Sequence, residues 1–127
     1  TERNKIMFGE VGVAYVYFTY GMHYCFNVVA KKKNDKAGAV LIRAIQPQKG
    51  INHMIKNRKT DIISNLTNGP GKLTQAMQIT LKQYNHDLTK KSSLFIIDSE
   101  KPNKIIAKPR VGIKIGVDKL WNFSYKI

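Results

Sequence analysis

The stretch from residue 11 to residue 30 constrains the fold more than any other feature, because it holds six aromatic residues and no charged one. Its length would suit a transmembrane helix, but tyrosines and other polar side chains interrupt it, and Gly21 lies near its middle. Its β-branched and aromatic residues favour strands. We therefore expect two antiparallel strands, Val13–Thr19 and His23–Val29, around a turn at residues 20–22, and no membrane span. Alternation places four side chains on one face: Val13, Tyr15, Tyr17 and Thr19.

The rest of the chain predicts short strands and short helices. A third strand is expected over Ala39–Ile45, before Gln46-Pro47. Helices are expected over Lys49–Lys59, where apolar residues recur at helical spacing, and over Lys72–Ile79, where Pro70 suits the first helical position. Further strands are expected at Leu94–Ile97, Lys104–Ala107, Arg110–Ile115 and Phe123–Ile127. This pattern predicts one α+β domain over residues 1–127, rich in antiparallel strands.

Cysteine and histidine usage excludes several classes of protein. The lone Cys25 excludes a disulfide framework and a cysteine-based zinc finger, and it fits a reducing cytoplasm. His23, His53 and His86 lie 30 or more residues apart, so no metal-ligand spacing occurs. We expect neither a metal nor another cofactor.

The charge balance points to a polyanionic partner. The chain has 22 Lys and Arg residues against 8 Asp and Glu residues, which gives a net charge of +14. The simplest partner is nucleic acid, and an anionic membrane surface is the second choice. Aromatic residues concentrated in the hairpin suggest base stacking, and Tyr20 at the turn could wedge between bases. The alternative is that Tyr15, Phe18 and Phe26 are core or sheet-face residues, which we favour for Phe18 and Phe26.

Two polar residues stand inside apolar strands. Asn27 must find hydrogen-bond partners there, either as a structural amide or as a reader of a base edge. Arg43 needs a carboxylate, a phosphate or water, yet the nearest acids in sequence are Asp35 and Asp61. Residue spacing leaves both readings of each residue open.

Five segments together resemble the alkyladenine (3-methyladenine) DNA glycosylase family, and they follow the family order across nearly the whole chain. They are Arg3-Asn4-x-x-Met7-Phe8, Tyr15-Val16-Tyr17-x-x-Tyr20-Gly21-Met22-x-Tyr24-Cys25-Phe26-Asn27, Val40-Leu41-Ile42-Arg43-Ala44, Asn68-Gly69-Pro70-Gly71-Lys72-Leu73-x-Gln75-Ala76 and Arg110-Val111-Gly112-Ile113. The resemblance implies an antiparallel, partly barrel-like sheet with flanking short helices. It also implies a monofunctional base-excision enzyme that flips a damaged purine out of duplex DNA and hydrolyses its glycosidic bond with water.

The resemblance assigns roles at matching positions. Tyr20 would fill the gap left by the flipped nucleotide, and Met22 and Tyr24 would line the minor-groove approach. Tyr17 would stack on the base, and Asn27 would crowd the exocyclic amino group of guanine. Arg43 and the backbone carbonyl of Val111 would hold the nucleophilic water. Three further residues resemble neighbours of the base pocket, with core packing as an equal alternative: Cys25, Leu41 and Met7.

One part of the family pattern has no match. The catalytic glutamate of the family lies in a Glu-x-Glu-Ala-Tyr-type segment upstream of the Arg-Asn motif, and neither Glu2 nor Glu10 matches it. We therefore expect residues 1–127 to be about the C-terminal two-thirds of such a domain, without its general base. A non-catalytic nucleic-acid-binding domain is the alternative. The resemblance further suggests a monomer that acts on double-stranded DNA in a bacterial-type cytoplasm, associated with the nucleoid.

Overall fold

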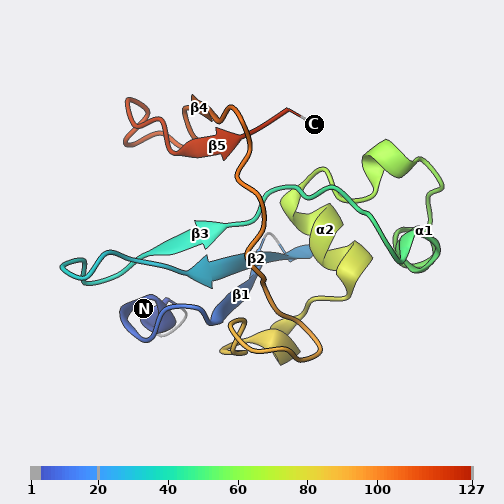
Figure 1. Ribbon diagram of the computed structural model, residues 1–127, viewed down its shortest axis with the longest axis horizontal. Coiled ribbons are helices and arrows are strands. Elements are labelled where there is room, and N and C mark those ends of the chain that lie inside the picture. Colours follow the sequence, from blue (N-terminus) through green and yellow to red (C-terminus); the bar gives the residue numbers. More distant parts are fainter. Residues whose placement is uncertain (1–3, 20, 127) are drawn as a thin grey trace. The chain divides into compact units, whose positions relative to one another are not determined.

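The computed structural model describes residues 4–19 and 21–126. The chain divides into two compact units, residues 1–96 and residues 97–127, each of which has its own sheet. The first unit contains a three-stranded antiparallel sheet in the order β1-β2-β3 (Figure 1). Its strands are β1 (Ala14–Thr19), β2 (His23–Val29) and β3 (Ala39–Leu41). The predicted hairpin is confirmed, with its first strand one residue shorter than expected.

Strand β3 ends earlier than the sequence predicts. Its last hydrogen bond to β2 runs from the amide of Ile42 to the carbonyl of Phe26 at 3.0 Å. Ile45 turns instead to Thr67, whose hydroxyl donates to the Ile45 carbonyl at 2.7 Å and whose carbonyl accepts from the Ile45 amide at 3.2 Å. Because Thr67 takes over the hydrogen bonds of this segment, the expected strand over Ala39–Ile45 is wrong beyond Ile42.

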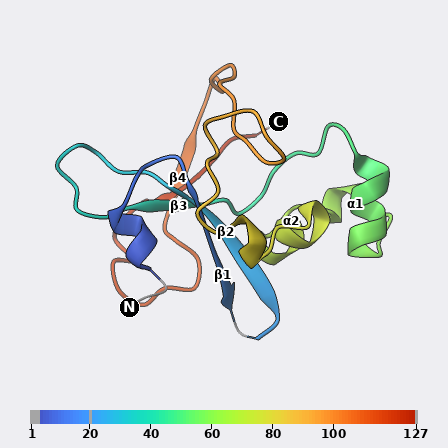
Figure 2. The same ribbon diagram turned by 90° about the horizontal axis from the view of Figure 1, so that it is seen from below.

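The helices follow the sheet in chain order and match the predicted positions within two residues. The two α-helices are α1 (Ile51–Arg58) and α2 (Pro70–Met77), the latter with Pro70 in its first turn. Short 3-10 turns are η1 (Lys5–Phe8), η2 (Ile63–Asn65) and η3 (Leu81–Gln83). Arg58 joins these parts: its guanidinium donates to the carbonyls of Leu66 and Asn65 and to the side chain of Gln75. The pairing of α1 with α2 is visible in Figure 2.

One face of the three-stranded sheet forms the core of the first unit. Ala14 and Val16 of β1 and Phe26 of β2 pack with Leu73 of α2 and with Ile79 and Leu88 beyond it. These strand residues share one face, since Val16 pairs with Phe26 and Ala14 with Val28. Burying such side chains is the main source of stability in a unit of this size. Phe18 shares this face but is 45% exposed, so it is a sheet-face residue, one of the two places expected for it, and not a core residue.

The second unit is a small hairpin of β4 (Ile106–Lys108) and β5 (Asn122–Ser124). The strand expected over Arg110–Ile115 is absent, because residues 111 and 112 form a turn in which Gly112 has φ 73°. The strand expected over Leu94–Ile97, at the end of the first unit, is absent too. There the amide of Ile96 bonds the carbonyl of Leu88 at 2.8 Å and closes a local loop.

The described strands confirm the antiparallel α+β class, and they form no closed barrel. None of the helices between residues 4 and 126 that the structure describes is long and apolar enough to cross a bilayer.

Candidate functional site

Four of the predicted base-pocket residues share one face of the three-stranded sheet, opposite the core. Tyr17 pairs with Cys25, and Asn27 lies between Tyr15 and Leu41 across three neighbouring strands. Directly opposed residues in antiparallel strands project from the same face, because side chains alternate along each strand. The structure therefore brings Tyr17, Cys25, Asn27 and Leu41 together with Tyr15. We call these five residues the tyrosine face.

Tyrosine rings form a connected layer on this face. The rings of Tyr15 and Tyr17 lie 5.2 Å apart between centroids and are tilted by 43°. Tyr84, just after η3, meets Tyr15 edge-on at 6.4 Å. Tilted and edge-on contacts at these distances are favourable for aromatic rings, and they hold each ring in one orientation. Tyr15 is buried, whereas Tyr17 is only half-buried and presents part of its ring to solvent.

Asn27 is fixed by a hydrogen bond within the sheet. Its Nδ2 donates to the carbonyl of Tyr15 at 3.2 Å, and the residue is 6% exposed. Among the described residues, every buried side-chain nitrogen or oxygen has a partner. Asn27 is thus a satisfied structural amide, and its amide plane is held beside the tyrosine rings. Both readings left open by the sequence remain compatible with this geometry, since a fixed amide is also what base discrimination requires.

Arg43 lies one residue beyond Ile42, whose amide makes a hydrogen bond to β2, and two residues beyond Leu41 in the alternation of the strand. It is half-buried, and its guanidinium makes no hydrogen bond or ion pair to the part of the chain that the structure describes. The buried salt bridge considered from the sequence therefore does not form among these residues. A partly exposed guanidinium without a protein partner is free to bind an anion or water.

The β1–β2 turn carries the predicted DNA-contacting residues. Tyr20 lies outside the described residues. Gly21 next to it has φ 62°, and the amide of Met22 closes the turn on the carbonyl of Thr19 at 3.2 Å. Met22 is 80% exposed. Tyr24, the second residue of β2, is half-buried, and the centroid of its ring lies 4.9 Å from that of Phe18.

Two further predicted residues do not belong to the strands that form this face. Met7 belongs to η1, and its carbonyl accepts a hydrogen bond from Gly38, just before β3. Val111 belongs to the second unit, where it is 62% exposed at a turn. Each is described only within its own unit.

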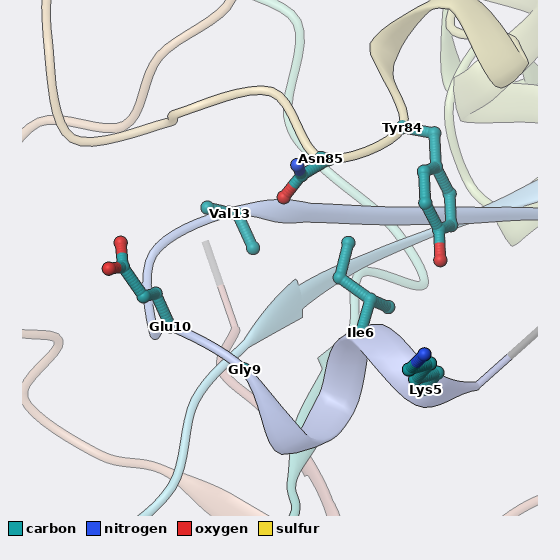
Figure 3. A pocket seen from close by; sticks show the side chains of 7 residues that line it. All are labelled: Lys5, Ile6, Gly9, Glu10, Val13, Tyr84 and Asn85. Carbon is teal, nitrogen blue, oxygen red and sulfur yellow. The ribbon is translucent and has the colours of Figure 1, made fainter.

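A cavity lies beside the start of β1 (Figure 3). Its volume is about 470 Å³, and its lining contains none of the predicted catalytic, base-pocket or DNA-binding residues, although it includes Glu10, which does not match the glutamate motif of the family. The residues that line it are Lys5, Ile6, Gly9, Glu10, Val13, Tyr84 and Asn85. Tyr84 connects it to the tyrosine face through its contact with Tyr15. No local sequence pattern indicates this cavity, because its walls come from two segments, residues 5–13 and residues 84–85, that are distant along the chain.

Titratable groups add little to the site. Hydrogen bonds from the Thr89 hydroxyl and the Thr89 amide lower the pKa of Asp87 below its ordinary value. Asp87 is exposed and pairs with Val13 at the edge of β1. Among the described residues, no group of three His, Cys, Asp or Glu side chains is arranged to hold a metal ion.

Comparison with known proteins connects this arrangement to a family. The model of the family described as methylpurine-DNA glycosylase (MPG) matches residues 1–126. A protein of Prosthecochloris aestuarii (strain DSM 271 / SK 413), named "Putative 3-methyladenine DNA glycosylase", is 49% identical over 126 residues, which cover 95% of this chain and 58% of the relative. Relatives with the same name come from Carboxydothermus hydrogenoformans (47% identical, 99% of this chain, 66% of the relative) and Clostridium novyi (42%, 99% and 67%). The chain thus spans about two thirds or less of the length of the curated relatives it matches.

Proposed function

Because the chain belongs to the methylpurine-DNA glycosylase family, we propose that it is the base-binding part of a DNA-repair glycosylase. The proposed enzyme hydrolyses the glycosidic bond between an alkylated purine and its sugar in duplex DNA. The observation that carries this proposal is the tyrosine face, where two tilted tyrosine rings in contact and a fixed amide lie together on one side of a sheet in a basic chain. Base stacking on aromatic rings contributes about 1–3 kcal/mol per base.

In this proposal the purine lies against the half-buried ring of Tyr17. Asn27, held by its bond to Tyr15, excludes unmodified guanine by crowding its exocyclic amino group. Cys25, Leu41 and Met7 line the pocket. Such selection is effective because a flipped base is read by its polar edge inside a close-fitting pocket.

The proposed chemistry uses an activated water and no metal or other cofactor. Arg43 holds the water or the negative charge near it, consistent with a guanidinium that has no partner among the described residues. The carbonyl of Val111 is the second proposed anchor of the water. The general base lies outside residues 1–127 in this proposal. A positioned base contributes typically 10²–10⁴-fold to a rate, so the chain by itself should turn over slowly.

The proposed DNA contact combines the β1–β2 turn with the basic surface. Tyr20 fills the space vacated by the flipped nucleotide, and Met22 and Tyr24 approach the minor groove. Lysines contact the phosphates in this proposal. The candidates are the run Lys31–Lys33, of which Lys32 and Lys33 are exposed, and the Lys56–Lys59 face of α1. We propose a monomer acting on damaged double-stranded DNA in the bacterial cytoplasm, at the nucleoid.

A non-catalytic DNA-binding domain is the second candidate function. It requires the same binding surface without turnover. The two functions make the same prediction for binding and opposite predictions for excision.

Two measurements test these proposals. The logarithm of the affinity for duplex DNA should fall linearly with the logarithm of the salt concentration, with a slope of about −0.9 for each phosphate neutralised. An affinity that does not change with salt would refute the basic-surface contact. Release of a methylated purine should be slow with residues 1–127 alone and fast once a family-type upstream segment is fused to them. Fast release by the 127-residue chain alone would overturn the assignment of the base, and Glu2 and Glu10 would become candidates.

A further inference from the structure

The edge of β2 that faces away from β1 forms hydrogen bonds with β3 along one part of its length and with helix α2 along another. The carbonyl of Phe26 bonds the amide of Ile42 along this edge. The carbonyl of Tyr24, two residues earlier, points to the same edge of the strand as that of Phe26. It accepts a hydrogen bond from the Thr74 hydroxyl at 3.0 Å. Thr74 belongs to α2 and is 2% exposed. The helix therefore takes the place that β3 leaves free, directly beside the first residues after the β1–β2 turn.

A second contact joins the same two segments even more closely. A β-carbon on Gly71 would lie 2.7 Å from Cγ and Cδ2 of His23 and 3.0 Å from its Cβ. Rotating the His23 ring would relieve the first two contacts but not the third, because Cβ moves only with the backbone. Only glycine therefore permits this approach of α2 to β2 without a shift of one element. The hydroxyl of Thr74 also lies 3.0 Å from the Gly71 carbonyl, so both contacts belong to one helical turn.

We propose that Gly71 and Thr74 are positioning residues that fix the direction in which the β1–β2 turn meets DNA. This inference rests on the proposed function, which assigns DNA contact to that turn. Met22 is 80% exposed and directly precedes His23. The contacts of Gly71 with His23 and of Thr74 with Tyr24 therefore lie next to this exposed residue of the turn. A displaced turn should lose recognition of the gap at a damaged site. It should keep phosphate binding, which depends on lysines elsewhere on the surface.

The test compares two DNA duplexes for each variant of the full chain. One duplex carries a single tetrahydrofuran abasic analogue, and the other is undamaged. Fluorescence anisotropy gives the Kd of each, and the preference for damage is the ratio of the Kd for the undamaged duplex to the Kd for the abasic duplex. An unfolded fraction lowers both apparent affinities equally, so this ratio reports positioning rather than stability. Gly71→Ala should reduce the ratio by about tenfold, because binding that depends on geometry is lost with displacements of ~1 Å.

Gly69→Ala is the matched control. Gly69 lies in the same turn with an extended backbone (φ −162°), and a β-carbon there meets only Lys72 side-chain carbons, at 3.6 Å or more. This variant should keep the wild-type ratio. In a His23→Ala background, Gly71→Ala should change the ratio much less than in the wild type, because the ring it would strike is gone. If Gly71→Ala does not fold, Thr74→Val should lower the ratio while Thr74→Ser preserves it.

Three results would overturn the inference. The first is a folded Gly71→Ala variant that retains the full preference for the abasic duplex. The second is a Gly69→Ala variant that loses as much preference as Gly71→Ala, and the third is a Thr74→Ser variant that loses as much as Thr74→Val. Failure of the proposed function looks different: the wild-type chain itself would then show no preference for the abasic duplex.

Discussion

The two faces of the three-stranded sheet alternate residue by residue along the same strands, yet they hold different chemistry. The core face presents Ala14, Val16 and Phe26 to Leu73 of α2. The tyrosine face presents Tyr15 and Tyr17 with Asn27, whose amide is tied to a backbone carbonyl. Both faces are buried near the centre of the sheet, so burial alone does not distinguish them.

The difference teaches where stability and recognition lie in this unit. An apolar face needs only close packing, because each buried carbon contributes to stability without a hydrogen-bond partner. A face with phenol and amide groups must satisfy each polar atom it buries, which limits what it adds to stability. Flat rings and a fixed amide suit a planar, polar ligand, and the proposed purine is such a ligand.

The largest effect should come from the core face. Phe26→Ala should lower the free energy of unfolding by about 3–5 kcal/mol, because it removes a buried ring and leaves a cavity against Leu73. Urea denaturation followed by circular dichroism measures this loss. Tyr17→Ala on the other face should cost clearly less, since that ring is half-buried. Equal losses for the two variants would contradict the division between the faces.

An intermediate effect is expected at Asn27. Asn27→Leu keeps much of the volume but removes the donor to the Tyr15 carbonyl, which should cost about 1–3 kcal/mol of unfolding free energy. The same variant should weaken discrimination against unmodified guanine in an excision assay with the complete protein. A variant as stable as the wild type would mean that the hydrogen bond contributes nothing to the sheet.

Much of this arrangement could be predicted from local sequence, and the failures have a common cause. Alternation predicted the hairpin and the shared face of Tyr15 and Tyr17, and Pro70 marked the start of α2. The end of β3 depends on Thr67, which lies more than 20 residues away from Ile45 in sequence.

Other features of the site were hidden from local sequence for the same reason. Phe18 alternates with Val16 along β1, but it is 45% exposed and does not belong to the core cluster that contains Leu73. The contact between Gly71 and His23 depends on how two distant elements pack. Spacing along the chain cannot reveal such partners, whereas Asn27 and Arg43 stand out from the sequence because they are polar residues inside apolar segments.

A small effect on stability is expected at Arg43. Arg43→Ala should change the free energy of unfolding by no more than about 0.5 kcal/mol, because the guanidinium has no partner among the described residues. Thermal unfolding of the two proteins under the same conditions measures the difference. A loss as large as that of Asn27→Leu would instead indicate a structural arginine.

The smallest effect should appear at the edge of β1, outside both faces. Hydrogen bonds from Thr89 lower the pKa of Asp87 in the folded chain from its ordinary 3.8. A lowered pKa stabilises the fold above the ordinary value and ceases to do so as the pH falls through the lowered one. Asp87→Asn should therefore slightly reduce stability at neutral pH and flatten its acid dependence. Parallel pH profiles of the two proteins would argue against this linkage.

The central claim, that the tyrosine face and Arg43 form a base site rather than a second core, is tested most directly by single-turnover excision of a methylated purine. The complete protein is compared with its Arg43→Ala variant, alongside their affinities for abasic duplex. Excision by Arg43→Ala should be slower than by the wild type by on the order of 100-fold, which is the usual effect of removing one group that stabilises reacting charge. Affinity for abasic DNA should remain within about threefold of the wild type. Unchanged excision, or a loss of excision matched by an equal loss of abasic-DNA affinity, would contradict the central claim.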